Sequence, residues 1–186
     1  MIDNIPTDDK RILLQLARIS LDNFFKNSPE LNKPEGSSIL DEEYGAFVTL
    51  HKKGHLRGCI GFIEAHQPLW KTIKDLALKS AFEDPRFPAL NDFELPDCEI
   101  EISVLTPLEK CPDPELVEVG KHGLYIRSGY DSGLLLPQVP VEWGWSREEF
   151  LDHTCIKAGL PSGCWKEPEA ELFWFSAIVF SEKNFD

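Results

Sequence analysis

The stretch "GHLRGCIGFIE", residues 54–64, places an arginine and a cysteine among three glycines. On an extended strand His55, Arg57, Cys59 and Gly61 share one face, and the side chains of Arg57 and Cys59 start roughly 7 Å apart. A guanidinium at that range lowers the pKa of a thiol and can hold an anionic ligand. The spacing therefore predicts a reactive Cys59 beside a ligand-binding Arg57. Burial of Cys59 in the core stays open, because free cysteine is among the most buried residue types.

Two glycines, Gly58 and Gly61, flank Cys59 and have two interpretations. One is structural: a β-bulge, or a helix lying close on the strand. The other is functional: open backbone N–H groups that a ligand can approach. The spacing does not match the dinucleotide-binding glycine fingerprint, so the stretch predicts no nucleotide and no cofactor.

Three residues outside this stretch are further candidates. Glu101 stands on the polar side of an expected strand. It has three interpretations: a catalytic base, an ion-pair partner of Arg57, or a solvated carboxylate. His122, in "GKHGL", is a candidate acid–base group. Arg86 is held between the two prolines of "DPRFP", where it binds a ligand or caps carbonyls. The candidate catalytic set is thus Cys59, Glu101 and His122, and the ligand-binding set is Arg57, Gly58, Gly61 and Arg86.

The sequence predicts no metal site. His51, His55 and Cys59 have a four-residue spacing, but on a strand His55 and Cys59 lie about 13 Å apart. Ligands of one zinc ion lie only about 2.0–2.3 Å from it. His153 and Cys155 are two apart on an expected helix and point in different directions.

The five cysteines are odd in number, have no C-x-x-C pair and follow nothing that resembles a secretory signal. The N-terminal stretch is also too polar to span a membrane. We therefore expect a cytoplasmic protein with reduced thiols. Cys59 is predicted to be the most reactive thiol because of Arg57. Three others are expected to be slower for local reasons: acidic neighbours at Cys98 and Cys111, and burial in a helix at Cys155. Cys164 is the rival, because the access of its exposed-looking position can outweigh the effect of pKa.

Composition limits the class of protein. A chain of 186 residues with 42% apolar residues predicts one globular domain spanning 1–186, or one domain with a small subdomain. The net charge of −13 counts against nucleic acid and anionic membranes as partners. A local basic pocket remains compatible with this charge.

Apolar spacing predicts a first helix with Thr7 as its N-cap and a stripe formed by Ile12, Leu13, Leu16, Ile19 and Phe24. A second helix begins at Pro68 and ends at "DPRFP", and its stripe contains Leu69, Ile73, Leu76, Ala77 and Ala81.

Between these helices, residues 46–63 predict a hairpin that turns at Lys53-Gly54. A three-residue turn would pair Thr49 with Arg57 and Phe47 with Cys59, and a two-residue loop would shift that register by one. The sequence leaves the two registers open.

The second half of the chain predicts mostly strands. "CEIEISVLTP" alternates with Ile100, Ile102 and Val104 on one face. Residues 123–138 form a second hairpin, and a helix begins with a Ser146–Glu149 capping box and ends at Gly159. "ELFWFSAIVFSE" is expected as one last, central strand. This order predicts an α+β fold with a mostly antiparallel sheet flanked by helices.

Six segments occur in this order: "GHLRGCIG", "AFEDPRFPAL", "EIEISVLTPLE", "GKHGLYI", "GLLLPQVPVE" and "FLDHTCIKAGL". Together they resemble the AMMECR domain family over nearly the whole chain, with "LRGCIG" as its signature. Pro140 is one departure, where the family often has alanine. The resemblance implies an α+β fold with a larger antiparallel-sheet part, a smaller subdomain and a cleft between them. It also implies a cytosolic or nuclear setting and association with Memo-like and radical-SAM proteins. It implies no reaction, because the family has no settled activity.

Two functions follow from these observations. The first is an enzyme or enzyme subunit that uses Cys59, with Arg57 holding a small anionic ligand. The second is a non-catalytic module that binds a partner protein or a small ligand. Nucleic-acid binding ranks last.

Overall fold

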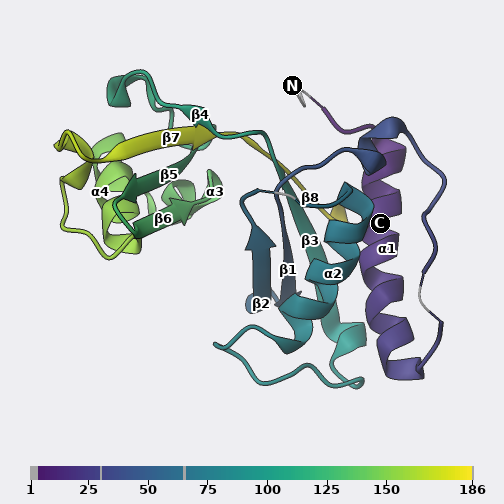
Figure 1. Ribbon diagram of the computed structural model, residues 1–186. Coiled ribbons are helices and arrows are strands. Elements are labelled where there is room, and N and C mark those ends of the chain that lie inside the picture. The colour runs from purple at the N-terminus through teal and green to yellow at the C-terminus, as the bar shows by residue number, and fades with distance from the viewer. Residues whose placement is uncertain (1–3, 30, 65, 186) are drawn as a thin grey trace. The chain divides into compact units, whose positions relative to one another are not determined.

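Two compact units make up the protein in the computed structural model, which describes residues 4–29, 31–64 and 66–185 (Figure 1). Unit 1 comprises Met1–Leu105 and Ile178–Asp186, and unit 2 comprises Thr106–Ala177. Each unit has its own four-stranded sheet and its own helices. The α+β class predicted from the sequence is confirmed, with two sheets in place of one.

Unit 1 is a sheet with the strand order β2-β1-β3-β8 and two long helices. Its elements are α1 (Thr7–Lys26), β1 (Ala46–Lys52), β2 (His55–Phe62), α2 (Leu69–Phe82), β3 (Cys98–Leu105) and β8 (Ala177–Ser181). Short 3-10 helices lie at Ser38–Asp41, Leu95–Asp97 and Glu182–Asn184. Strand β1 pairs antiparallel with both β2 and β3.

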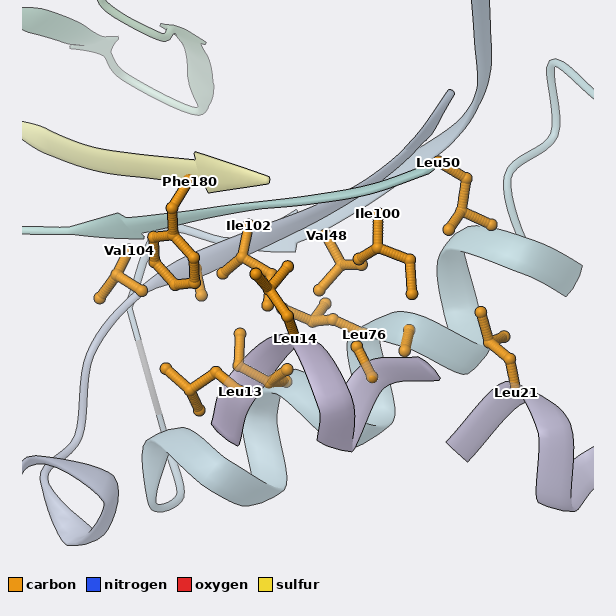
Figure 2. Close-up of a cluster of buried hydrophobic side chains, with 14 of the residues drawn as sticks. Leu13, Leu14, Leu21, Val48, Leu50, Leu76, Ile100, Ile102, Val104 and Phe180 are labelled. Atoms are coloured by element: carbon orange, nitrogen blue, oxygen red, sulfur yellow. The ribbon is translucent and has the colours of Figure 1, made fainter. Parts of the chain in front are cut away.

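One face of this sheet carries the core. Alternate residues of β1 and β3 are fully buried, and helices α1 and α2 pack their apolar stripes against them. Figure 2 shows these side chains pointing toward one another from the strands and both helices. The members labelled there are Leu13, Leu14, Leu21, Val48, Leu50, Leu76, Ile100, Ile102, Val104 and Phe180. The other face therefore carries the intervening, mostly polar positions.

Helix α1 buries only part of the predicted stripe: Leu13 and Leu16 are buried, and Ile12 is partly buried against the core. Thr7 is its first helical residue, and the flanking residue is Pro6, which makes no side-chain cap. Ile19 and Phe24 are 42% and 53% exposed, so placing them in the core was wrong. The apolar residues that the helix buries are Leu13, Leu14, Leu16, Ala17 and Leu21. In contrast, α2 buries all five residues of its predicted stripe and begins at Leu69, one residue after Pro68.

The β1–β2 hairpin has a two-residue loop and a bulge. Lys53 and Gly54 both have positive φ angles, 53° and 80°, as a type I′ turn requires. Lys52 pairs with His55, but Leu50 pairs with Gly58, so Arg57 is the extra residue on β2. The bulge returns Cys59 to a position opposite Thr49. Of the two loops that the sequence left open, the two-residue loop is present. The unbroken alternation through Arg57 was wrong.

Salt-bridged side chains satisfy part of the β3 backbone. Glu182 accepts a 2.8 Å hydrogen bond from the N–H of Ile100. Arg18 donates to the carbonyls of Leu95 and Cys98, at 3.0 and 2.6 Å, and also pairs with Glu182. This pair thus takes the place of a neighbouring strand at the start of β3.

Unit 2 has the strand order β4-β7-β5-β6 with antiparallel pairing. Its elements are β4 (Glu109–Lys110), β5 (Gly123–Ser128), β6 (Asp131–Leu135), α3 (Gln138–Trp143), α4 (Arg147–Lys157) and β7 (Glu171–Phe175). The predicted hairpin is present as β5 and β6, and α4 begins with the predicted Ser146–Glu149 capping box. Cys155 and Cys164 form a disulfide, which corrects the expectation that all five thiols are reduced.

The last predicted strand is two strands. Residues 171–175 form β7 inside the unit 2 sheet, and residues 177–181 form β8 at one end of the unit 1 sheet. Ser176 lies between them, and its N–H donates to the hydroxyl of Thr106 at 2.8 Å. A continuous apolar run cannot show such a change of sheet. Among the described residues, no helix is both long and apolar enough to cross a membrane.

Candidate functional site

A thiol, a hydroxyl and a carboxylate form one row across the unit 1 sheet. Thr49 of β1 pairs with Cys59 of β2 on one side and with Glu101 of β3 on the other. Since residues directly opposite on antiparallel strands point to the same face, all three side chains stand on the face opposite the core. We call Cys59, Thr49 and Glu101 the polar row.

The thiol of Cys59 is hydrogen-bonded and protonated at neutral pH. The hydroxyl of Thr49 donates to Sγ of Cys59 at 3.1 Å. Burial raises the pKa of the Cys59 thiol, and the negative charges of Asp84 and Glu101 raise it further, while the Thr49 bond and the charge of Arg86 oppose them. The prediction of a thiol activated by Arg57 thus fails on electrostatics. The cation that acts on Cys59 is Arg86.

The "DPRFP" turn holds the backbone of Cys59. Asp84 is buried, and its carboxylate accepts from the N–H of Cys59 at 2.8 Å and from Nε and Nη2 of Arg86 at 3.0 and 2.7 Å. Nη2 of Arg86 also donates to the carbonyl of Cys59 at 3.3 Å. The guanidinium holds the pKa of Asp84 well below its usual range. Arg86 thus caps a carbonyl, as one of its two interpretations had it, and its half-exposed side chain still faces solvent.

His51 adds a titratable group to the same face. It lies on β1 two residues from Thr49, and its Nε2 is 3.9 Å from a carboxylate oxygen of Glu101. That separation is too long for a hydrogen bond, so the nearby negative charge is what raises the pKa of His51. Within the described residues, Nε2 of His51 is buried and has no hydrogen-bond partner.

Arg57 does not reach an open site. Its guanidinium donates to both carboxylate oxygens of Glu94, at 3.3 and 3.0 Å, and its side chain is only 11% exposed. Lys52 donates to the same carboxylate at 2.8 Å. The two cations lower the pKa of Glu94 to about 2. The role of Arg57 as an anion holder is therefore wrong, because its charge is already matched inside the fold.

The two glycines beside Cys59 have structural roles. A Cβ atom on Gly58 would lie 2.0 Å from the carbonyl oxygen of Ser80, so α2 approaches β2 there. A Cβ atom on Gly61 would lie 2.2 Å from the ring of Phe47, its partner across the hairpin. Close packing, one of the two interpretations, accounts for both, and neither backbone is open for a ligand on its Cβ side.

His122 belongs to unit 2, whereas Cys59 and Glu101 belong to unit 1. Its Nδ1 accepts from the N–H of Glu118 at 3.1 Å, and its ring lies 4.4 Å from that of Trp174. Burial lowers the pKa of His122, so the ring is neutral at neutral pH. The imidazole closes a turn and packs on an aromatic ring.

Four residues of the site were missed from the sequence: Thr49, Asp84, Glu94 and His51, the last of which was considered only as a metal ligand. The turn signal at Asp84 was available, because an Asp two residues before Arg86 binds that backbone N–H, here at 3.0 Å. No local signal pointed to Thr49 or Glu94. Thr49 lies opposite Cys59 only because of the bulge, and Glu94 contacts Arg57 from a segment distant in the sequence. Of the predicted residues, the structure brings together Cys59, Glu101 and Arg86.

Comparisons with known proteins agree with this architecture. The AMMECR1 family model matches residues 14–180. A protein of Aquifex aeolicus is 46% identical over 95% of this chain and 94% of its own length, and one of Methanothermobacter thermautotrophicus is 43% identical over 94% and 95%. The crystal structure of an uncharacterized protein from Pyrococcus horikoshii matches with a TM-score of 0.86 and 42% identity, over 92% of this chain and 90% of that one. The chain belongs to the AMMECR1 family.

Proposed function

We propose that unit 1 is a binding module for a small polar ligand and that its site is the polar row of Cys59, Thr49 and Glu101. The observation that carries this proposal is the cross-strand register, which gathers the three groups on the face opposite the core. Next to them lies Nε2 of His51, buried and without a hydrogen bond in the described part of the chain. Leaving such a group unsatisfied is costly, and a ligand that accepts or donates there would remove the cost.

In this proposal Cys59 is a protonated hydrogen-bonding group. Its raised pKa leaves little thiolate at neutral pH, and thiolate is the nucleophilic form. A polar ligand would meet the carboxylate of Glu101 and, at the edge of the sheet, the half-exposed guanidinium of Arg86. An oxygen-bearing ligand with a hydrogen-bond donor matches these two groups.

Labelling with iodoacetamide tests the state of Cys59. It is the least buried of the three free cysteines, so it should label first, but slowly at pH 7 and faster as the pH approaches 9. Arg57→Ala should leave that rate unchanged, since Arg57 is paired with Glu94. Arg86→Ala should slow it, because Arg86 is the cation that favours the thiolate. Rapid labelling at pH 7 that depends on Arg57 would contradict the proposal.

Native mass spectrometry of the purified protein tests the binding itself. A bound small molecule should be carried by the wild type and lost in Glu101→Gln. The matched control is Cys111→Ser, which alters a buried thiol in unit 2. Equal retention in both variants would place the ligand away from the polar row.

An enzyme that uses Cys59 is the second candidate. The observation that favours it is the position of Arg86, whose charge lowers the pKa of Cys59 against the effect of burial. A ligand that displaced Asp84 from Arg86 would shift that balance toward thiolate. Labelling that accelerates only in the presence of a bound ligand would favour this candidate over a binding module.

We further propose a cytoplasmic location and Memo-like and radical-SAM proteins as partners. Support for these partners comes from the family resemblance alone. Co-purification from cells with tagged wild type and with Glu101→Gln tests it, and no enrichment of either partner class over an unrelated tagged protein would refute it.

A further inference from the structure

A second candidate site lies in unit 1, in a groove of about 730 Å³ between α1, the hairpin turn and the C-terminal segment. The helix contributes one face, on which Arg11, Leu14, Arg18 and Ile19 follow one another at spacings of three, four and one. The volume falls within the range of small-molecule sites. All the residues that line the groove belong to unit 1.

The walls combine apolar surface with unmatched positive charge. Apolar contacts come from Ile19, Pro96 and Phe185. The exposed side chain of Ile19 is thus part of the groove wall. Two lining cations are already neutralised, Arg18 by Glu182 and Lys183 by Glu99.

The remaining charges in the groove favour an anion. Lys53 has no ion pair within the described residues. Arg11 has an exposed contact of 3.8 Å with Asp8, and its guanidinium lies 5.3 Å from the ring centroid of Phe185. Asp97 opposes them and is exposed. His51, whose pKa is raised by Glu101, also lines the groove. The balance is positive in a chain whose net charge is −13.

Lys53 sits where a lysine is disfavoured. Its φ angle of 53° lies in the left-handed region, and the first position of a type I′ turn prefers Asn, Asp or Gly. An unfavourable backbone conformation at a residue with an unpaired charge points to a role for that side chain beyond folding.

We propose that this groove binds a small amphipathic anion, with an apolar body against Ile19, Pro96 and Phe185 and a carboxylate, sulfonate or phosphate near Lys53. The groove is separate from the polar row, although His51 borders both. Binding here does not depend on the function proposed for Cys59.

Titration with 1-naphthyl phosphate, followed by amide chemical shifts, tests the proposal, with 1-naphthylmethylammonium as the probe of opposite charge. The phosphate should bind and shift α1 and hairpin-turn amides, and the ammonium probe should not. Lys53→Asn should weaken the phosphate roughly two- to fivefold, the range expected for one partly exposed ion pair. It should also raise the melting temperature, because Asn tolerates the left-handed conformation.

Matched substitutions locate the site. Ile19→Gln should weaken binding about three- to tenfold through lost apolar contact. Ile156→Gln and Lys157→Asn, exposed positions on α4 of unit 2, should leave binding unchanged, and so should Cys59→Ser. Equal binding of both probes, no binding of the phosphate, or indifference to both groove variants would overturn the proposal.

Discussion

Gly58→Ala is predicted to destabilise unit 1 by about 3 kcal/mol, the upper end of the usual cost of overpacking. The added Cβ would lie 2.0 Å from the carbonyl oxygen of Ser80 and 3.1 Å from its carbonyl carbon. An ordinary C···O contact is about 3.3 Å or longer, so the two backbones must separate by roughly 1.3 Å. Ser80 is 1% exposed and lies on α2 between the buried Ala77 and Ala81, so the helix cannot yield locally.

The measurement is urea unfolding followed by far-UV circular dichroism. Hydrogen exchange of β2 amides is needed as well, because two compact units need not unfold together. Gly54→Ala is the control: no atom lies within 4 Å of its Cβ, and only its φ of +80° is unfavourable, which costs about 1 kcal/mol. A Gly58→Ala variant no less stable than Gly54→Ala would refute the close approach of α2, and a ligand role for this glycine would return.

Three other predictions concern charge and cross-linking. The folded pKa of Glu94, about 2, lies below its unfolded value, so ionised Glu94 stabilises the fold above about pH 4.5, and this stabilisation is lost as the pH falls toward 2. In urea unfolding across this range, the wild type should lose on the order of 2 kcal/mol of unfolding free energy that Glu94→Gln does not lose. The folded pKa of His51 is raised instead, so its contribution is complete below about pH 6.5 and is lost as the pH rises; unfolding at pH 5.5 and 8.5 should show this loss in the wild type and not in Glu101→Gln. Replacing Cys155 and Cys164 by alanine should cost about 2–3 kcal/mol of unit 2 stability by calorimetry, the chain-entropy value for a short loop; an unchanged melting temperature would refute it.

Sequence patterns predicted those parts of the fold that depend on local repetition. The apolar residues of α2 recur every three or four positions, and Ile100, Ile102 and Val104 recur every second position. Each spacing identifies the buried face of its element directly from the sequence. The stripe of α1 was harder to place, because this helix has apolar residues on two faces. Ile19 belongs to the second, which lines the groove.

Some residues of the candidate site could be named from the sequence, but most of their contacts could not. Cys59 and Arg86 were named from composition and turn chemistry, and they do meet. The partner of Arg57 could not be found from the sequence, because it depends on the bulge at Arg57. The bulge reverses the sheet face to which the preceding residues of β2 point. His122 and Cys59 belong to different compact units, and the point where the chain leaves one sheet for the other is marked by no local pattern.

Two acid–guanidinium pairs bind strand backbone from outside the sheet, Asp84–Arg86 at β2 and Arg18–Glu182 at the start of β3, and this has a consequence for behaviour at high concentration. An unpaired strand edge is a template onto which another copy can add a strand, the first step of sheet aggregation. Each pair occupies an outward N–H and an outward carbonyl, so an incoming strand would have to displace a salt bridge as well as water. The guanidinium of Arg86 keeps the pKa of Asp84 well below its usual range, so the obstacle at β2 persists in moderately acid solution. We therefore expect Asp84→Ala, which removes that obstacle, to favour association through the β2 edge more than a change in pH does.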